Sequence, residues 1–289
     1  MIRKAVIPAA GFGTRFLPAS KSQPKEMLPI VDTPVIQYVV QEAVDSGITD
    51  ILMIIGKGKR AVEEHFDRNF ELEAELVEKG KVEELEMIRR ISDLADIHFV
   101  WQKELRGLGD AVACARHHVG REPFAILLGD TVLESGSPVT RQLMNVYERY
   151  QESIAALEEV PEEKVHRYGV IKGQAIRPDL YLVEDFVEKP SKAEAPSRLA
   201  IAGRYVFTPD IFDHLAKTVP GKNNEIQLTD AMRSLVATRA CYGLKFAGRR
   251  YDVGNKLDFV RTNVSFALKR DDLREDVTAF IRQLAAELG

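Results

Sequence analysis

The segment "VIPAAGFGTRFLPASKSQPKEMLPI", residues 6–30, decides the fold. It begins as an apolar strand, turns at Gly11 and Gly13, and continues as a proline-spaced loop that carries Arg15 and Lys25. A glycine turn after a first parallel strand lies in the usual ligand crevice of α/β proteins. Glycines let backbone N–H groups approach a phosphate closely, and prolines hold nearby cations in place. The segment therefore predicts a polyphosphate site.

Two common nucleotide folds are excluded by the same segment. The G-x-x-x-x-G-K-[ST] pattern of P-loop proteins is absent. The dinucleotide fingerprint needs a third glycine where this chain has Phe16, and no acidic residue closes the second strand, which ends at residues 56–59, "GKGK". A dehydrogenase of the Rossmann type is therefore not expected.

Apolar runs and amphipathic stretches alternate along the first half of the chain. Strands are predicted at 4–8, 50–55, 96–102 and 123–130, and helices at 35–47 and 109–120. Residues 61–91 are rich in charge and predict solvated helices. After residue 150 the strands have hairpin-like spacing. The pattern predicts an α/β fold with a Rossmann-like mixed, mainly parallel central sheet, helices on both faces, and a β extension.

Composition narrows the classes of protein that remain. The chain has 289 residues and a formal net charge of −4, which argues against a general nucleic-acid binder. No stretch has the roughly 18 apolar residues of a membrane span, and the N-terminus lacks the apolar run of a signal peptide. Two cysteines, Cys114 and Cys241, predict neither disulfides nor a zinc site, so a cytoplasmic location is expected. His117 and His118 diverge by about 100° on a helix and are not predicted to bind a metal as a pair.

Several motifs appear in the order typical of one family. They are the opening segment, "QKELRGLGDAV", "LLGD", "HRYGV", "FVEKP", "APSRLAIAGRYVF", "EIQLTDA" and "YDVGNK". Together they resemble the sugar-nucleotide pyrophosphorylases, and in detail the bacterial members that use UTP and glucose 1-phosphate. The resemblance implies attack of a sugar 1-phosphate on the α-phosphorus of a nucleoside triphosphate, with release of pyrophosphate. It implies Mg²⁺ as cofactor and a homodimer or homotetramer. Two alternatives to this function are an enzyme that uses dTTP in place of UTP, and a regulatory protein that binds a sugar nucleotide without catalysis.

The resemblance assigns roles to particular residues. It implies one domain over 1–289, with a nucleotide-binding part at 1–150, a sugar-binding part at 151–255 and C-terminal helices at 256–289. The implied catalytic cations are Arg15, Lys25 and Lys189. The implied nucleotide-binding residues are Ala10, Gly11, Gly13, Glu26, Gln102, Gly107 and Asp130, and the sugar-binding residues are Gly169, Glu188 and Gly203. Asp130, after an apolar strand, and Asp252 are the metal candidates, since Mg²⁺ prefers carboxylate oxygens.

Two features of the sequence do not fit the pattern simply. Glu188 and Lys189 are neighbours on a predicted strand and should point to opposite faces, unless Pro190 ends the strand and twists the pair. Asp110 stands where the family commonly has histidine, and Thr131 where many members have a second acid. These departures concern base preference and rate more than the class of reaction.

Overall fold

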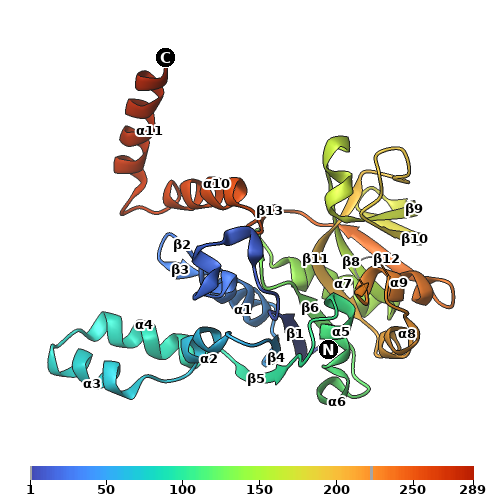
Figure 1. Ribbon diagram of the computed structural model, residues 1–289, viewed down its shortest axis with the longest axis horizontal. Helices are drawn as coiled ribbons and strands as arrows, with labels where there is room; N and C mark the ends of the chain where they lie inside the picture. Colours follow the sequence, from blue (N-terminus) through green and yellow to red (C-terminus); the bar gives the residue numbers. More distant parts are fainter. Residues whose placement is uncertain (1, 222–223) are drawn as a thin grey trace.

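The structure is a computed structural model that describes residues 2–221 and 224–289. A nine-stranded sheet forms its centre, with the order β5-β4-β1-β6-β11-β8-β12-β10-β9 (Figure 1). Its strands are β1 (Lys4–Pro8), β4 (Asp50–Ile55), β5 (Asp96–Trp101), β6 (Phe124–Leu127), β8 (Ser153–Glu159), β9 (Gly169–Arg177), β10 (Leu180–Glu188), β11 (Leu199–Phe207) and β12 (Cys241–Lys245). Two short ribbons pair β2 (Pro29–Ile30) with β3 (Thr33–Pro34), and β7 (Thr131–Glu134) with β13 (Arg249–Asp252).

The two halves of the sheet differ in strand direction. From β5 to β6 all neighbours are parallel, and beyond β6 only β8 and β12 are. The pairs β6–β11, β11–β8, β12–β10 and β10–β9 are antiparallel. A further antiparallel pairing joins β11 and β9, so within the described residues the sheet has four parallel and five antiparallel pairs. The predicted mixed α/β fold is confirmed, whereas a mainly parallel sheet is not.

Helices cover both faces of the sheet, as predicted. The α-helices are α1 (Val35–Asp45), α2 (Arg60–Phe66), α3 (Phe70–Glu78), α4 (Val82–Ser92), α5 (Leu108–Ala113), α6 (Arg116–Val119), α7 (Val139–Tyr150), α8 (Ile211–Lys217), α9 (Leu228–Val236), α10 (Lys256–Ala267) and α11 (Arg274–Leu288). Successive strand residues point to opposite faces, so Ala5 and Ile7 pack with α1, α2 and α7. Val6, between them, packs with α5, α6, α8 and α9.

Short 3₁₀ turns replace regular structure where the opening segment leaves the sheet. They are η1 (Thr14–Phe16), η2 (Ala19–Lys21) and η3 (Lys25–Met27), with η4 (Glu162–Arg167) before β9. Phe16 is buried and meets Phe259 of α10 edge to face at 5.6 Å. The residue that breaks the dinucleotide fingerprint therefore docks the loop onto a C-terminal helix.

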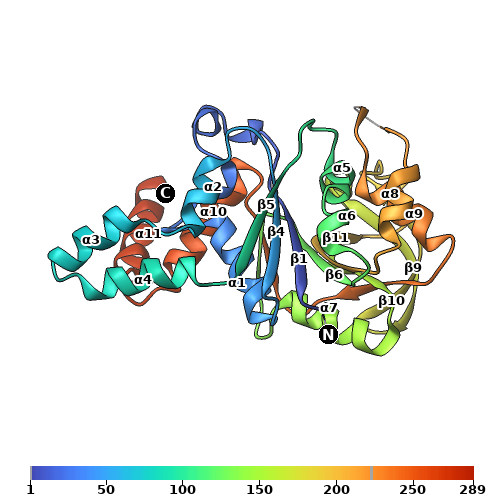
Figure 2. The same ribbon diagram turned by 90° about the horizontal axis from the view of Figure 1, so that it is seen from below.

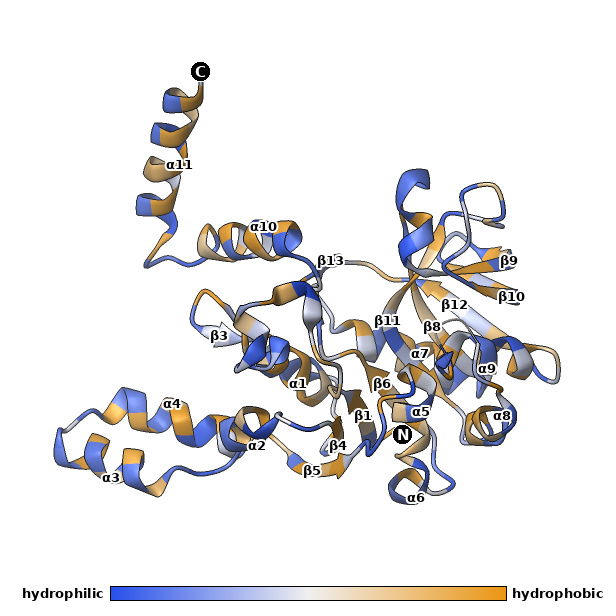
Figure 3. Cartoon of the chain, viewed as in Figure 1, coloured by the Kyte–Doolittle hydropathy of each residue, from blue (hydrophilic) through white to orange (hydrophobic). Residues whose placement is uncertain are grey.

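Two helical arms extend from the body of the molecule. The α3–α4 pair lies at one end, and α10 and α11 lead away to the C-terminus (Figures 1 and 2). Hydrophobic and hydrophilic residues alternate around these helices (Figure 3), and Phe70 and Phe280 are among the exposed apolar side chains. The charge-rich region 61–91 is helical, as predicted, and forms α2, α3 and α4.

The predicted elements agree closely with the observed ones in the first half. The bounds of β1 and β4 are those predicted, and β5 ends one residue earlier. The predicted helix 109–120 is divided into α5 and α6 around Cys114 and Ala115. No helix in the described part of the chain is long and apolar enough to cross a membrane.

Candidate active site

The predicted nucleotide-binding residues lie around one cavity of about 490 Å³. The cavity opens where β1, β5 and β6 end, so the carboxyl ends of parallel strands meet there. Its lining includes Ala10, Gly11, Gly13, Lys25, Glu26, Gln102, Gly107 and Asp130. Glu225 also lines it, from the "EIQLTDA" motif, to which no role was assigned.

Two glycines allow the walls of this cavity to approach one another. Gly13 has φ 67°, and a Cβ added there would lie 3.0 Å from Cβ of Lys25. Gly107 has φ 98°, and its Cβ would lie 2.8 Å from the carbonyl oxygen of Ile226. Both positions combine a left-handed backbone with a close neighbour, so any other residue would be strained there.

Lys25 and Asp130 form an ion pair on the cavity wall. The Lys25 ammonium lies 2.5 Å from Oδ2 of Asp130. Burial alone would lower the pKa of Lys25, but the charges of Asp130 and Glu26 raise it above its ordinary value. Burial alone would raise the pKa of Asp130, but Lys25 and, more weakly, Arg15 hold it below its usual range. Both groups are therefore charged at neutral pH.

A second ion pair lies behind the first and was missed by the sequence analysis. Lys59 donates to Oε2 of Glu26 at 2.6 Å, and the side chains are only 4% and 1% exposed. Burial raises the pKa of Glu26 and lowers that of Lys59, because both charged forms are desolvated. The signal for it was the basic turn "GKGK" after β4, which faces the opening loop. Glu26 lines the cavity, and its contact with a base stays a prediction.

Gln102 is held in one orientation at the end of β5. Its amide nitrogen donates to the carbonyl oxygen of Gly107 at 3.2 Å and to Oδ2 of Asp110 at 2.8 Å. Arg106 donates to the other oxygen of Asp110 at 3.0 Å. The residue that departs from the family pattern, Asp110, thus fixes the amide plane that faces the cavity.

A short ribbon brings the backbone of the two metal candidates close together. In the pairing of β7 with β13, Asp252 is opposite Thr131, the residue that follows Asp130. The carboxylate of Asp252 accepts the Tyr168 hydroxyl at 3.2 Å and the Gly254 N–H at 2.8 Å. The Cα atoms of antiparallel partners lie about 4.5–5.5 Å apart, so the backbone of Asp252 runs beside the turn that carries Asp130.

Arg15 extends to the same neighbourhood from the opening loop. A Cβ added at Gly254 would lie 3.7 Å from Nη1 of Arg15, and the charge of Arg15 contributes to the lowered pKa of Asp130. Arg15 is exposed at the end of η1. Arg15 and Lys25 of the opening segment, Asp130 before β7 and Asp252 of β13 therefore lie in the same region, from three separate segments.

The predicted sugar residues form a second group beside Tyr168. The Lys189 ammonium lies 3.0 Å from Oε1 of Glu188, whose Oε2 accepts the Thr229 hydroxyl at 2.7 Å. A Cβ at Gly169 would lie 3.3 Å from the same Oε2. Lys189 has φ 44°, and β10 ends at Glu188. The left-handed turn lets two neighbouring side chains contact each other, which the alternation of a strand would forbid.

Gly203 lies apart from this group, on β11. It falls at a register shift between Ile201 and Tyr205, and its carbonyl oxygen accepts the N–H of Leu128 at 3.0 Å. A Cβ there would lie 3.1 Å from Cδ1 of Leu128, a residue of the cavity wall. Gly203 therefore supports the cavity through Leu128, and its contact with a sugar stays a prediction.

A buried arginine that the sequence did not single out supports the turn that carries Asp130. Arg204 donates to Oε2 of Glu42 at 2.8 Å, and both side chains are buried. Its guanidinium also donates to the carbonyl oxygens of Leu128 at 3.3 Å and Thr131 at 2.8 Å. These two bonds bracket Asp130, so Arg204 is a positioning residue for it.

Comparison with known proteins identifies the family. The sequence matches the nucleotidyl transferase family over residues 4–268. It is 53% identical over 283 residues to the UTP–glucose-1-phosphate uridylyltransferase of Bacillus subtilis, covering 98% of this chain and 97% of that protein. The protein of the same name from Staphylococcus epidermidis is also 53% identical, covering 98% of each chain. The chain therefore belongs to the nucleotidyl transferase family, and within it to the UTP–glucose-1-phosphate uridylyltransferases.

Solved structures agree with this assignment. A UDP-glucose pyrophosphorylase complexed with UDP-glucose superposes with a TM-score of 0.87 at 43% identity, covering 93% of this chain and 100% of that one. The UTP-bound enzyme from Acinetobacter baumannii gives a TM-score of 0.90 at 38% identity, covering 100% of both chains. The predicted family and activity are thus confirmed.

Proposed function

We propose that this protein transfers the uridylyl group of UTP to glucose 1-phosphate, forming UDP-glucose and releasing pyrophosphate. A phosphate oxygen of the sugar forms a bond to the α-phosphorus of UTP, and the bond from that phosphorus to the bridging oxygen of pyrophosphate breaks. One observation carries the proposal: Lys25 and Asp130 form an ion pair on the wall of a glycine-lined cavity, where the parallel strands β1, β5 and β6 end. The names of the relatives support the choice of substrates.

The main contribution of this site to the reaction is to neutralise the negative charge of the phosphate groups. The attacking phosphate is already an anion, so no strong general base is required. Arg15 and Lys25 are assigned to stabilise the negative charge that grows on the leaving pyrophosphate. The raised pKa of Lys25 keeps its ammonium protonated at neutral pH. Lys189 is assigned to the sugar phosphate, so that two like-charged reactants can approach each other.

Asp130 and Asp252 fit a divalent cation of the Mg²⁺ class. They offer hard carboxylate oxygens, Asp130 from the residue before β7 and Asp252 from the end of β13, whose backbone pairs with Thr131. When bound, Mg²⁺ would neutralise phosphate charge beside the reacting centre. The lowered pKa of Asp130 keeps that carboxylate ionised and ready to bind a cation.

The uracil is assigned to the cavity lined by Gln102, and the glucose to the group of residues around Glu188. Because the amide nitrogen of Gln102 is held by two acceptors, its oxygen is assigned to accept the N3–H of uracil. Backbone at Ala10, Gly11, Gly13 and Gly107 is assigned to the rest of the nucleotide. Glu188, beside Gly169, is assigned to accept hydrogen bonds from glucose hydroxyls. These would either displace the hydrogen bond from the Thr229 hydroxyl or bind the carboxylate together with it.

One experiment tests this function against its rivals. Each of several nucleoside triphosphates, including UTP and dTTP, is combined with glucose 1-phosphate and other sugar 1-phosphates, and pyrophosphate release is measured. We expect the highest kcat/KM with UTP and glucose 1-phosphate. Uracil and thymine differ by one methyl group, worth about 1–3 kcal/mol, so the dTTP reaction should be slower but measurable. A higher kcat/KM with dTTP, or no release with any pair, would contradict the proposal.

The metal assignment has a test of its own. Asp130→Asn keeps the side-chain shape and removes the charge, so we expect kcat to fall by about 10²–10³ at saturating Mg²⁺. Asp179→Asn is the matched control, since Asp179 lies in the turn between β9 and β10 and pairs with Arg177. Full activity of Asp130→Asn, or of the wild type in excess chelator, would remove Asp130 and the cation from the mechanism.

Assembly and location remain proposals. We expect a cytoplasmic homodimer or homotetramer, with α10 and α11 as the candidate contact region because Leu257, Val260 and Phe280 are exposed there. Light scattering on the full chain measures the mass in solution. A monomer at micromolar concentration would contradict the expected assembly.

A further inference from the structure

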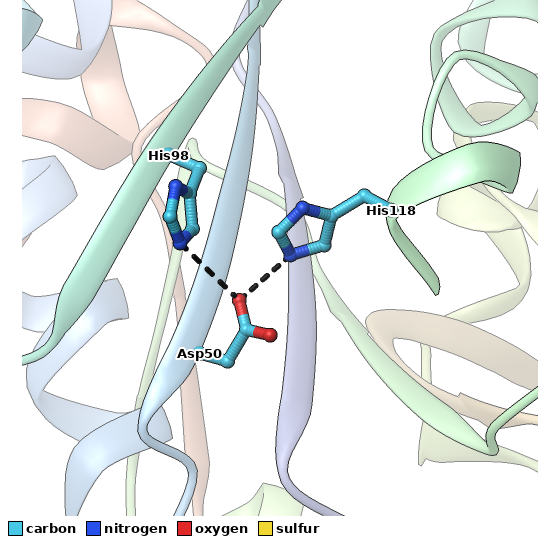
Figure 4. A group of neighbouring side chains, drawn as sticks. All are labelled: Asp50, His98 and His118. Atoms are coloured by element: carbon cyan, nitrogen blue, oxygen red, sulfur yellow. Dashed lines mark hydrogen bonds and ion pairs between the residues drawn. The ribbon is translucent and has the colours of Figure 1, made fainter. Parts of the chain in front are cut away.

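Two histidines and an aspartate converge on the sheet away from the proposed active site. Asp50 begins β4, His98 lies on β5, and His118 lies on α6 (Figure 4). Nε2 of His118 lies 2.7 Å from Oδ1 of Asp50, and Nε2 of His98 lies 3.9 Å from the same oxygen. The three ligand atoms lie within 4.8 Å of one another. Nothing in the proposed reaction uses these residues.

The register of the sheet explains why they meet. Asp50 pairs with Asp96 in the parallel β4–β5 ladder, so His98, two residues on, projects from the same face. That face is the one covered by α6, from which His118 approaches. The residues come from three elements, and the site is therefore formed only by the folded chain.

The surroundings leave the triad open to a ligand. His98 is 55% exposed, and among the described residues its ring has no hydrogen-bond partner, although it points toward Asp50 (Figure 4). Lys4, the neighbour of Asp50 on β1, is engaged with Glu122 at 2.6 Å and with the carbonyl oxygen of His118 at 3.0 Å. The exposed side of His98 gives water access to the triad.

The donor set and its spacing match a particular class of ion. A tetrahedral Zn²⁺ with bonds of about 2.0–2.1 Å holds its ligand atoms roughly 3.3 Å apart. The distances from Oδ1 of Asp50 to Nε2 of His118 and of His98, 2.7 and 3.9 Å, lie on either side of that value. Small rotations of two partly exposed rings would equalise them. Imidazole nitrogens favour Zn²⁺ and similar transition ions over Mg²⁺, which prefers oxygen.

We propose that Asp50, His98 and His118 bind a transition-metal dication of the Zn²⁺ class, with water completing the coordination. The ion joins β4, β5 and α6 at the amino end of the parallel strands, opposite the proposed active site. Its role is structural, because a ligand that binds only the folded state stabilises it. The proposal is independent of the proposed catalytic function.

Calorimetric titration with ZnCl₂, in saturating Mg²⁺ to occupy the carboxylate site, tests this. We expect one Zn²⁺ per wild-type chain, at least tenfold weaker binding in His98→Asn and His118→Asn, and unchanged binding in His117→Asn. Co²⁺ in place of Zn²⁺ should give visible absorption bands in the wild type that are lost in His98→Asn. Zn²⁺ should also raise the Tm of the wild type but not of His98→Asn.

His98→Asn is the decisive variant, since His98 makes no hydrogen bond to a described residue and its loss should leave the fold and the Mg²⁺-supported turnover intact. His118→Asn also removes a bond to Asp50, so its result is secondary. Equal Zn²⁺ affinity in the wild type and His98→Asn would overturn the proposal, as would the absence of Co²⁺ bands in the wild type.

Discussion

The nucleotide side and the sugar side of the proposed active site are built differently. On the nucleotide side, Glu26 and Lys59 are an ion pair removed from water, and Gln102 is buried. On the sugar side, the side chain of Lys189 is 47% exposed and meets Glu188 near the end of a strand. The first is supported by the core of the parallel half-sheet and the second by its antiparallel extension. We infer that the nucleotide side is preorganised, whereas the sugar side can adjust to its substrate.

If the nucleotide side is preorganised by its buried ion pair, the largest loss of stability should follow from replacing Lys59. Lys59→Met leaves the buried Glu26 without its hydrogen-bonded partner, and only the nearby charge of Lys25 remains, so we expect a loss of about 3 kcal/mol in the free energy of unfolding. Urea denaturation measures this loss. The double variant Lys59→Met/Glu26→Leu should recover much of the stability, because it removes both charges. Exposed Lys57→Met is the control and should be neutral. If Lys59→Met is as stable as the control, the nucleotide side is not preorganised by this pair.

Arg15 and Lys25 should affect the transition state more than substrate binding. Each alanine variant should lose roughly 10²–10³ in kcat, by analogy with the removal of one oxyanion donor. Lys21→Ala, an exposed cation of the same loop, is the matched control and should keep wild-type kinetics. A rise in KM with kcat nearly unchanged would show that these cations only hold the substrate.

How much of this site can be predicted from the sequence depends on how far apart in the chain the contacting residues are. The bounds of β1 and β4, and the glycine turn, follow from local patterns of hydrophobicity and turn residues. Ala10, Gly11, Gly13, Lys25 and Glu26 of the opening segment therefore line one cavity. The pairing of Asp252 with Thr131 joins segments far apart in the chain, and no local pattern contains it.

The same limit applies to the residues that were missed. The support of Asp130 by Arg204 and the bond between Lys59 and Glu26 both depend on how distant segments pack. The left-handed backbone of Lys189 resolves the conflict between Glu188 and Lys189, and only Pro190 hinted at it. The predicted mainly parallel character of the sheet is not confirmed for a related reason, since strand direction beyond β6 is set by tertiary pairing.

Lys189 provides the direct test of the sugar side. Lys189→Ala should raise the KM for glucose 1-phosphate and lower kcat, each by about tenfold, with little change in stability because the side chain is half exposed. Affinity for UTP, measured by calorimetry, should change little. Lys189→Arg should restore only part of the activity, since a planar guanidinium replaces a compact ammonium. Lys192→Ala, on the following loop, is the control. Loss of UTP binding with an unchanged KM for glucose 1-phosphate would show that Lys189 belongs to the nucleotide side and not to the sugar side.

The smallest expected effect is a local change of stability in the α3–α4 arm, which belongs to neither the nucleotide side nor the sugar side. Glu73 accepts hydrogen bonds from Arg68 at 2.5 Å and Arg89 at 2.8 Å, and these lower its pKa from the ordinary 4.5 to about 2. A lowered carboxyl pKa stabilises the folded arm above the unfolded pKa, and this stabilisation is lost as the pH falls from about 4.5 toward 2. Amide hydrogen exchange in α3 and α4 should therefore accelerate, beyond its intrinsic pH dependence, between pH 6 and pH 3.5.

Glu73→Gln separates this ion pair from the other carboxylates that titrate in acid. The variant should show fast exchange in the arm already at pH 6 and a smaller further change at pH 3.5, while its turnover at pH 7 stays at the wild-type level. Glu75→Gln, which removes an exposed pair with Lys79, should behave like the wild type. If the wild type and Glu73→Gln exchange alike at both pH values, the arm is held by its apolar contacts. Slower turnover in Glu73→Gln would instead show that the arm is coupled to the proposed active site.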